Sequence, residues 1–115
     1  MTKYGQVALL ATEYIQKGQS AEQAWENASC ELLVKGSSSQ IKGCPKGAFM
    51  GLFSKDQSKR NGKNAVYAQK ALSILKNNPN HKYSKSELWS LVVNEPIKHN
   101  AQMDVVMTLW DHNLI

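Results

Sequence analysis

The chain has 115 residues and a net charge of +5, with 42% hydrophobic and 20% charged residues. This composition is typical of one globular domain and excludes a disordered chain. No stretch approaches the roughly 20 apolar residues of a membrane helix, and the start lacks the apolar run of a signal peptide. We therefore expect a single domain over residues 1–115, a cytoplasmic location and no membrane partner.

The positive charge is concentrated in the middle of the chain. Between residues 34 and 86 there are eleven basic residues and one acid, Asp56, so this segment carries +10 while the two flanks together carry −5. Such asymmetry favours an anionic partner, either nucleic acid or a phosphate group. The alternative is a solvated basic face without a partner.

The N-terminal part predicts a helical hairpin. Apolar residues recur at three- and four-residue steps over residues 3–17, which indicates an amphipathic helix ended by Gly18. Ser20 and Gln23 form a capping box that opens a second helix. We expect this helix to run to Gly36, with Lys35 in its last turn.

A polar loop from Gly36 to Gly43 precedes a third, shorter helix. Pro45 suits the first position of that helix, which makes Cys44 the N-cap. Gly47 and Gly51 are poor helix residues, but their spacing of four places them on one helix face. This spacing predicts the close approach of another helix.

The segment 54–63 is entirely polar and predicts a mobile basic loop. Asn64 is then placed to cap a fourth helix. Ser84 and Glu87 form a second capping box, with a fifth helix that extends to about Val93. A strand over residues 91–93 is the alternative for the end of that helix.

A sixth helix is expected near the C-terminus. Asn100 is placed to cap it, and Asn113 resembles a left-handed C-cap. The elements together predict an all-α fold, a compact irregular or orthogonal bundle of about six helices.

Cys44 is the residue with the most chemical potential. A thiol at a helix N-terminus, close to Lys42 and Lys46, favours a thiolate that acts as a nucleophile or redox sensor, or a site for phosphate. Nucleophilic catalysis also needs a base, for which the sequence offers only three unplaced histidines, His81, His99 and His112. The alternative is a small buried hydrophobic residue, and both Cys44 and Cys30 are expected to be free thiols.

Metal and cofactor signatures are missing from the sequence. The cysteine and histidine spacings contain no pair two to five residues apart, as zinc sites require. No P-loop or Gly-x-Gly-x-x-Gly pattern occurs either. We therefore expect no metal and no cofactor.

Two groups of residues are candidates for contacts with partners. Trp89 and Trp110 fall on or beside apolar stripes, so they either pack in the core or anchor a partner or a second copy of the chain. The candidates for contacting an anion are basic residues of the central segment. They are Lys42, Lys46, Lys55, Lys59, Arg60 and Lys63.

Two motifs resemble a family of small uncharacterised bacterial proteins. The first is Cys44-Pro45-Lys46-Gly47-Ala48-Phe49-Met50-Gly51-Leu52, which has the family's Cys-Pro-basic-Gly-Ala-Phe-aliphatic-Gly-Leu pattern. The second is the ending from Asn100 to Ile115. The resemblance implies a compact domain and assigns no activity. The chain departs from the pattern after Leu52, where its lysine-rich segment begins.

Three functions follow in order of preference. The first is a non-enzymatic module that binds an anionic partner through the basic central surface. The second is a protein that self-associates through an apolar face, and the third is an enzyme or redox sensor that uses Cys44. An enzyme is the least expected because no pair of positioned polar residues is evident.

Overall fold

The structure, a computed structural model, describes residues 2–95 and 97–115, and the regular structure within them is helical. The elements are α1 (Lys3–Gln16), α2 (Ala21–Leu32), α3 (Gly43–Phe53), the 3-10 helix η1 (Gln57–Arg60), α4 (Lys63–Asn77), α5 (Lys85–Val92) and α6 (Gln102–Asp111). The radius of gyration is 13.2 Å, close to the value of about 13 Å for one domain of this length. The predicted all-α fold is confirmed.

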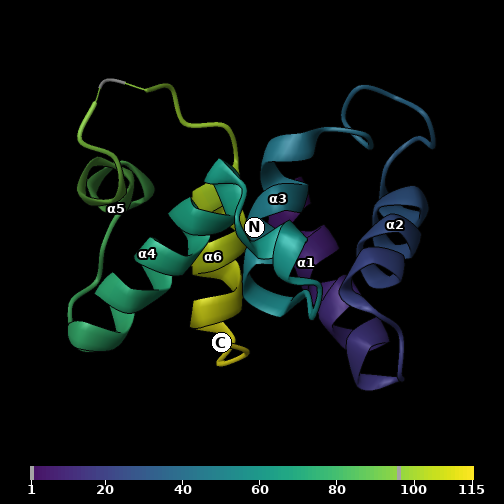
Figure 1. Ribbon diagram of the computed structural model, residues 1–115, viewed down its shortest axis with the longest axis horizontal. Helices are drawn as coiled ribbons and strands as arrows, with labels where there is room; N and C mark the ends of the chain where they lie inside the picture. The colour runs from purple at the N-terminus through teal and green to yellow at the C-terminus, as the bar shows by residue number, and fades with distance from the viewer. Residues whose placement is uncertain (1, 96) are drawn as a thin grey trace.

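The C-terminal helix α6 lies at the centre of the molecule (Figure 1). It packs against α1, α3, α4 and α5, and its residues Met103, Val105, Val106 and Leu109 are fully buried. The α1–α2 hairpin lies on one side of α6, and α4 and α5 lie on the other. The last helix of the chain therefore joins the two sides through one apolar core.

Two predicted helix ends are confirmed, and both have the same geometry. Gly18 has a φ of 103° and Asn113 a φ of 59°. After α6, the Leu114 N–H donates to the Leu109 carbonyl over 2.9 Å. This is a Schellman motif, which satisfies carbonyls that the helix leaves free.

Two predicted helix starts are also confirmed. Ser20 Oγ accepts a hydrogen bond from the Gln23 N–H at 3.2 Å, and Ser84 Oγ accepts one from the Glu87 N–H at 3.1 Å. Each hydroxyl caps one backbone donor in the first turn. α5 stays helical to Val92, so the end of this element is a helix rather than a strand.

The close helix approach predicted from Gly47 and Gly51 occurs between α3 and α4. A Cβ atom on Gly51 would lie 2.6 Å from the carbonyl oxygen of Ala65, and one on Gly47 would lie 2.9 Å from Cβ of Asn64. Both distances are too short for real atoms. Glycine is therefore needed for α3 to lie directly against α4.

The predicted end of the second helix is wrong. α2 ends at Leu32, and Leu33 is extended, with φ −124° and ψ 160°. Lys35 therefore lies outside the helix, in a segment of residues 33–42 that we call the α2–α3 loop. The physical reason is the buried side chain of Gln40, which gives this loop its own hydrogen bonds in place of another helical turn.

The predicted start of the third helix is also wrong. α3 begins at Gly43, so Cys44 is its second residue and Pro45 its third, and Lys42 stands at the N-cap without a capping side chain. The N–H groups of a first helical turn have no partner within the helix. Proline therefore fits at the third position as well as at the first.

Neither Asn64 nor Asn100 caps a helix as predicted. Asn64 lies inside α4, where its Oδ1 accepts a hydrogen bond from Gln102 Nε2 at 2.9 Å. Asn100 precedes Ala101, which adopts a φ of 70° before α6 begins. Both amides bond to other elements, and such tertiary partners cannot be read from local sequence.

The segment 54–63, predicted to be mobile, is hydrogen-bonded to its neighbours. Asp56 caps the short helix η1 within it. Gln69 Nε2 of α4 donates to the Arg60 carbonyl at 3.2 Å and to the Gly51 carbonyl at 3.1 Å. One side chain thus ties this segment to both α3 and α4.

Candidate anion-binding site

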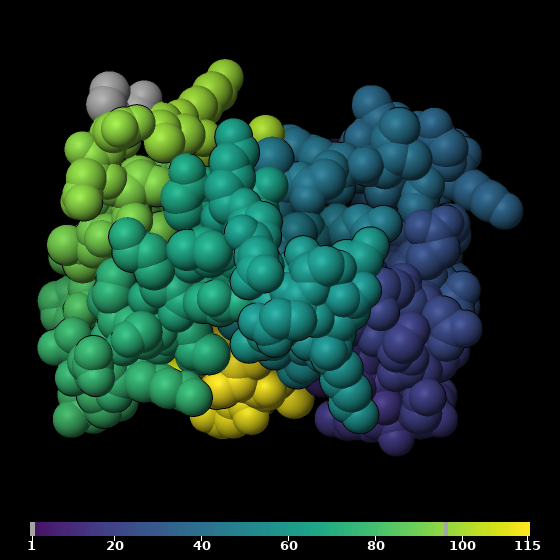
Figure 2. All heavy atoms as spheres, viewed as in Figure 1, coloured from purple at the N-terminus to yellow at the C-terminus, as the bar shows by residue number. Residues whose placement is uncertain are grey.

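The α2–α3 loop has a defined shape because side chains bond to it from several directions. Gln40 Oε1 accepts from the Gly36 N–H at 3.1 Å, and Gln40 Nε2 donates to Ser29 Oγ of α2 at 2.9 Å. The Tyr4 hydroxyl of α1 donates to the Ser39 carbonyl at 2.9 Å. The loop forms the upper right corner of the molecule (Figures 1 and 2).

The surface is hollowed where this loop meets the start of α1. Lys3, Tyr4, Ser38, Ser39 and Lys42 line the hollow, which has a volume of about 380 Å³. Lys3 Nζ lies 5.3 Å and Lys42 Nζ lies 5.7 Å from the centroid of the Tyr4 ring. Lys3 Nζ also donates to Ser39 Oγ at 3.0 Å. We call this site the Lys3–Lys42 hollow.

The charges distinguish this hollow from four others of similar size, 320–440 Å³. Each of the four has an acidic residue in its lining. The first hollow contains Glu22 and Asp56, and the other three contain one acid each, namely Asp111, Glu31 and Glu13. The charged residues of the Lys3–Lys42 hollow are both lysines, so a ligand there meets positive charge alone.

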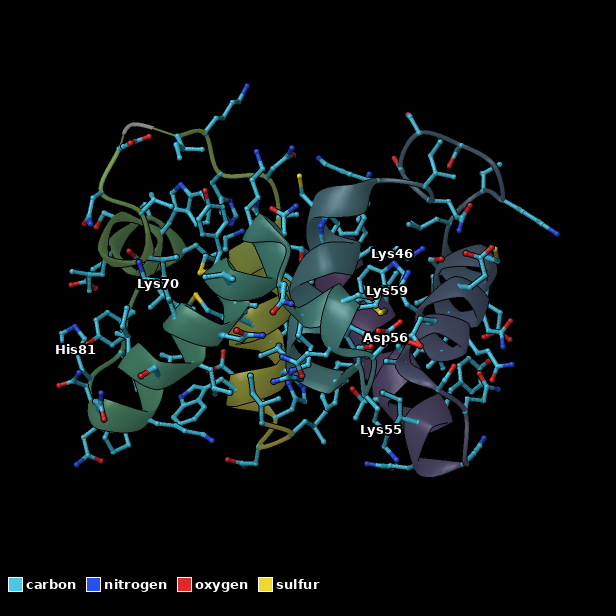
Figure 3. All side chains as sticks on the ribbon, viewed as in Figure 1. Lys46, Lys55, Asp56, Lys59, Lys70 and His81 are labelled. Carbon is cyan, nitrogen blue, oxygen red and sulfur yellow. The ribbon has the colours of Figure 1, made fainter. Side chains whose placement is uncertain are left out.

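The six predicted anion-binding residues do not gather in one place. Lys42 lines the hollow, and the others are not among its lining residues. Figure 3 shows Lys46 and Lys59 close together beside α3 and Asp56 between Lys59 and Lys55, with Lys70 across the face over α4. Lys63 is exposed at the first position of α4.

Arg60 of the same predicted group is engaged within the protein. Its Nη1 donates to the Ser54 carbonyl at 3.3 Å, and its own carbonyl accepts from Gln69. A guanidinium that bonds to the backbone fixes the local chain and has fewer donors left for a ligand. The basic residues of this segment therefore differ in how far their charges are available to a ligand.

Cys44 belongs to a polar junction where α3, α4 and α6 begin. Asn100 Nδ2 donates to Cys44 Sγ at 3.5 Å, and the Asn100 N–H donates to Gln102 Oε1 at 2.8 Å. Gln102, itself buried, also donates to Asn64. The network fixes the relative positions of the three helix starts.

His99 precedes this junction in the chain, and its contacts make it a poor base for Cys44. Its Nε2 accepts a hydrogen bond from the Met103 N–H at 3.0 Å, which places the ring proton of the neutral form on Nδ1. Burial, opposed by Asp104, holds the pKa of His99 below its usual value. The Nε2 lone pair is therefore already used as a cap for α6.

The remaining histidines and Cys30 have contacts elsewhere. His81 Nε2 lies 3.4 Å from Glu87 Oε2, and His112 Nδ1 lies 2.9 Å from the Thr108 carbonyl. Cys30, like Cys44, is a free thiol. Burial and the neighbouring Glu26 raise the pKa of Cys30, which favours the less reactive thiol form.

The two tryptophans singled out as partner anchors have different surroundings. Trp89 is 6% exposed, its Nε1 donates to the Ile97 carbonyl at 2.8 Å, and its ring lies edge-on to Tyr67. Trp110 is half-buried and lines a hollow of about 440 Å³ together with Met107. Trp89 therefore packs in the core, and Trp110 is partly exposed at the surface.

Two further properties apply to residues 2–95 and 97–115. None of their helices has both the length and the apolar character needed to cross a bilayer. Nor do three or more His, Cys, Asp or Glu side chains gather in them as metal ligands would.

Sequence reasoning found Lys42 and missed the residues around it. Lys3 and Tyr4 lie in the first turn of α1, more than thirty positions before Ser38 and Ser39. The run of three serines was visible in the sequence, but it indicated only a polar loop. Its approach to α1 depends on the Tyr4 hydrogen bond, which has no local sequence signal.

In the described part of the chain, six α-helices, of which the C-terminal α6 is the central one, and a lysine-lined hollow at one corner define a small all-α domain. The chain belongs to a family of unknown function, DUF6979, whose pattern matches residues 1–115. No curated protein and no solved structure matches the chain. Membership of an uncharacterised family is thereby confirmed, while the bacterial origin stays a prediction.

Proposed function

We propose that this chain is a non-enzymatic binding module that holds a phosphate group in the Lys3–Lys42 hollow. The observation that carries the proposal is that two lysines, with their ammonium groups 5.3 Å and 5.7 Å from the centroid of the Tyr4 ring, line one hollow and are its charged residues. This assigns the expected anionic partner to a specific place on the protein.

Electrostatics gives the physical reason. Two ammonium groups that line one hollow repel each other, and an anion bound in that hollow attracts both of them. Lys3 and Lys42 supply charged donors, and the Ser38 and Ser39 hydroxyls supply neutral ones. A phosphate carries two negative charges or nearly so at neutral pH and accepts several hydrogen bonds at once. Its chemistry matches this donor set.

The preformed shape of the α2–α3 loop also supports the proposal. Gln40 accepts a hydrogen bond from the backbone N–H of Gly36, which precedes the two serines, and the Tyr4 hydroxyl donates to the carbonyl of Ser39. A ligand therefore does not have to order the loop when it binds, which reduces the entropic cost of association.

Titration of the full chain with inorganic phosphate tests the proposal. We expect shifts of the Ser38, Ser39 and Lys42 amide signals in two-dimensional NMR spectra, and weaker binding as ionic strength rises. Lys70→Gln is the matched control, because Lys70 lies over α4 (Figure 3). Saturating shifts that avoid these amides, or no shifts at all, would overturn the proposal.

A further inference from the structure

The α2–α3 loop exposes two aliphatic side chains close to its lysines in the sequence. Val34 is 77% exposed and Ile41 is 66% exposed, the highest values among the large hydrophobic residues of the described chain. Ile41 immediately precedes Lys42 of the hollow. A single exposed aliphatic side chain is common on protein surfaces, but the two most exposed large hydrophobic residues of the described chain both lie on this loop. Their occurrence on one loop favours a contact outside the molecule.

The sequence that follows Val34 is basic, while Glu31 of α2 stands three residues before it. Residues 32–55 contain four lysines and no acidic residue, and Lys3 reaches the same loop from α1. The α2–α3 loop, which lies at the upper right in Figures 1 and 2, therefore carries both exposed aliphatic side chains and positive charge. This combination is the one that proteins use to bind the surface of an anionic membrane.

We propose that the α2–α3 loop binds the surface of a membrane that contains anionic phospholipids. A lipid phosphate occupies the Lys3–Lys42 hollow, while Val34 and Ile41 enter the boundary between headgroups and acyl chains. The inference rests on the proposed function, since it names the source of the phosphate. The sequence-based expectation of no membrane partner came from the lack of a spanning segment, and a protein bound at the membrane surface needs no such segment.

Two other partners fit the corner less well. A nucleic acid offers phosphates for the lysines, but its backbone offers no apolar phase for Val34 and Ile41. A second copy of the chain in a two-fold contact would bring each lysine-rich loop against its own image. The like charges of Lys35 and Lys42 would then oppose that contact.

Sedimentation with lipid vesicles tests the inference on the full chain. We expect binding to vesicles of phosphatidylcholine that contain phosphatidic acid, whose phosphate is a monoester like the one proposed for the hollow, and little binding to pure phosphatidylcholine, whose phosphate is a diester neutralised by choline. The double variant Val34→Ser/Ile41→Ser should bind the mixed vesicles roughly tenfold more weakly. The same variant should keep wild-type binding of inorganic phosphate, because neither side chain lines the hollow.

Leu91→Ser is the matched control, since Leu91 is also exposed, at 51%, but lies on α5. It should bind mixed vesicles like the wild type. Equal vesicle binding by the wild type and the double variant would overturn the inference, as would preferential binding to duplex DNA that the double variant retains.

The failures of the two proposals can be distinguished. Phosphate shifts in the hollow without vesicle binding would overturn the membrane inference alone. Absence of both would overturn the proposed function with it. Vesicle binding lost in Val34→Ser/Ile41→Ser but unchanged in Lys42→Gln would assign the contact to the aliphatic side chains and overturn the role of the hollow.

Discussion

The α2–α3 loop and the segment 54–63 are both polar and basic, but they place their charges differently. In the first, Lys3 and Lys42 both lie near the Tyr4 ring and line a hollow that has no acidic residue in its lining. In the second, Asp56 is present and Arg60 bonds to the backbone. The comparison shows that the number of lysines in a segment does not define an anion site, because each charge depends on its neighbours in space.

Helix α3 connects these two regions, so its position affects both. Gly51→Ala would place a methyl group 2.6 Å from the Ala65 carbonyl oxygen and 2.8 Å from its Cβ. We expect the largest effect among our predictions, a loss of about 3 kcal/mol in the free energy of unfolding, measured by urea denaturation.

Gly43→Ala is the control for this change. A Cβ at Gly43 meets nothing within 4 Å, and alanine favours a helix more than glycine does. This variant should match or slightly exceed the wild type in stability. A Gly51→Ala protein as stable as the wild type would contradict the close packing of α3 on α4.

Each region depends on one glutamine, which allows a matched pair of variants. Gln40→Ala removes the hydrogen bonds that this buried side chain makes to Gly36 and Ser29. We expect the free energy of unfolding to fall by about 2 kcal/mol. Phosphate affinity should fall with it, because the loop that holds Ser38 and Ser39 loosens.

Gln69→Ala is the counterpart in the second region. Gln69 is half-buried and ties the segment 54–63 to α3, so we expect a smaller loss of about 1 kcal/mol. Phosphate binding should not change. Equal effects of both variants on phosphate affinity would remove the functional distinction between the two regions.

The sequence predicted the parts of the fold that depend on local interactions. Capping by Ser20 and Ser84 needs only a hydroxyl and the next turn, and the turn at Gly18 needs only a residue that accepts a positive φ. The glycines at 47 and 51 showed that a helix would pack closely, although not which one. These features are encoded within a few residues.

The parts that were missed depend on distant partners. Asn64 and Asn100 looked like caps, but their amides bond to Gln102 and Cys44 once α3, α4 and α6 meet. The hollow was missed for the same reason, since Tyr4 and Ser39 are 35 positions apart. A single sequence gives residue types and spacing but not such long-range pairs.

Charge removal compares the two regions directly. Lys42→Gln should weaken phosphate binding roughly threefold to tenfold, as expected for the loss of one charged donor near the surface. Lys55→Gln and Lys59→Gln should bind phosphate with the affinity of the wild type, within experimental error, at moderate ionic strength. Calorimetric or NMR titrations of the three variants would measure this, and equal losses in all three would indicate a diffuse basic surface instead of a site.

The prediction with the smallest expected effect concerns the pKa of His99, which depends on the charge at Lys42. Burial lowers the pKa of His99 from its usual 6.5, Asp104 opposes this shift, and Lys85 and Lys42 add to it. Since the folded pKa lies below the unfolded one, the contribution of His99 to stability is constant above pH 6.5 and decreases as the pH falls from 6.5 towards the folded pKa. Lys42→Gln should raise the pKa of His99, and bound phosphate should raise it too, because both reduce the positive charge near the ring.

Lys55→Gln is the control and should leave the NMR titration curve of His99 unchanged. If the pKa of His99 responded equally to Lys42→Gln and Lys55→Gln, it would depend on the net charge of the whole protein. That result would contradict a local effect of Lys42 on His99.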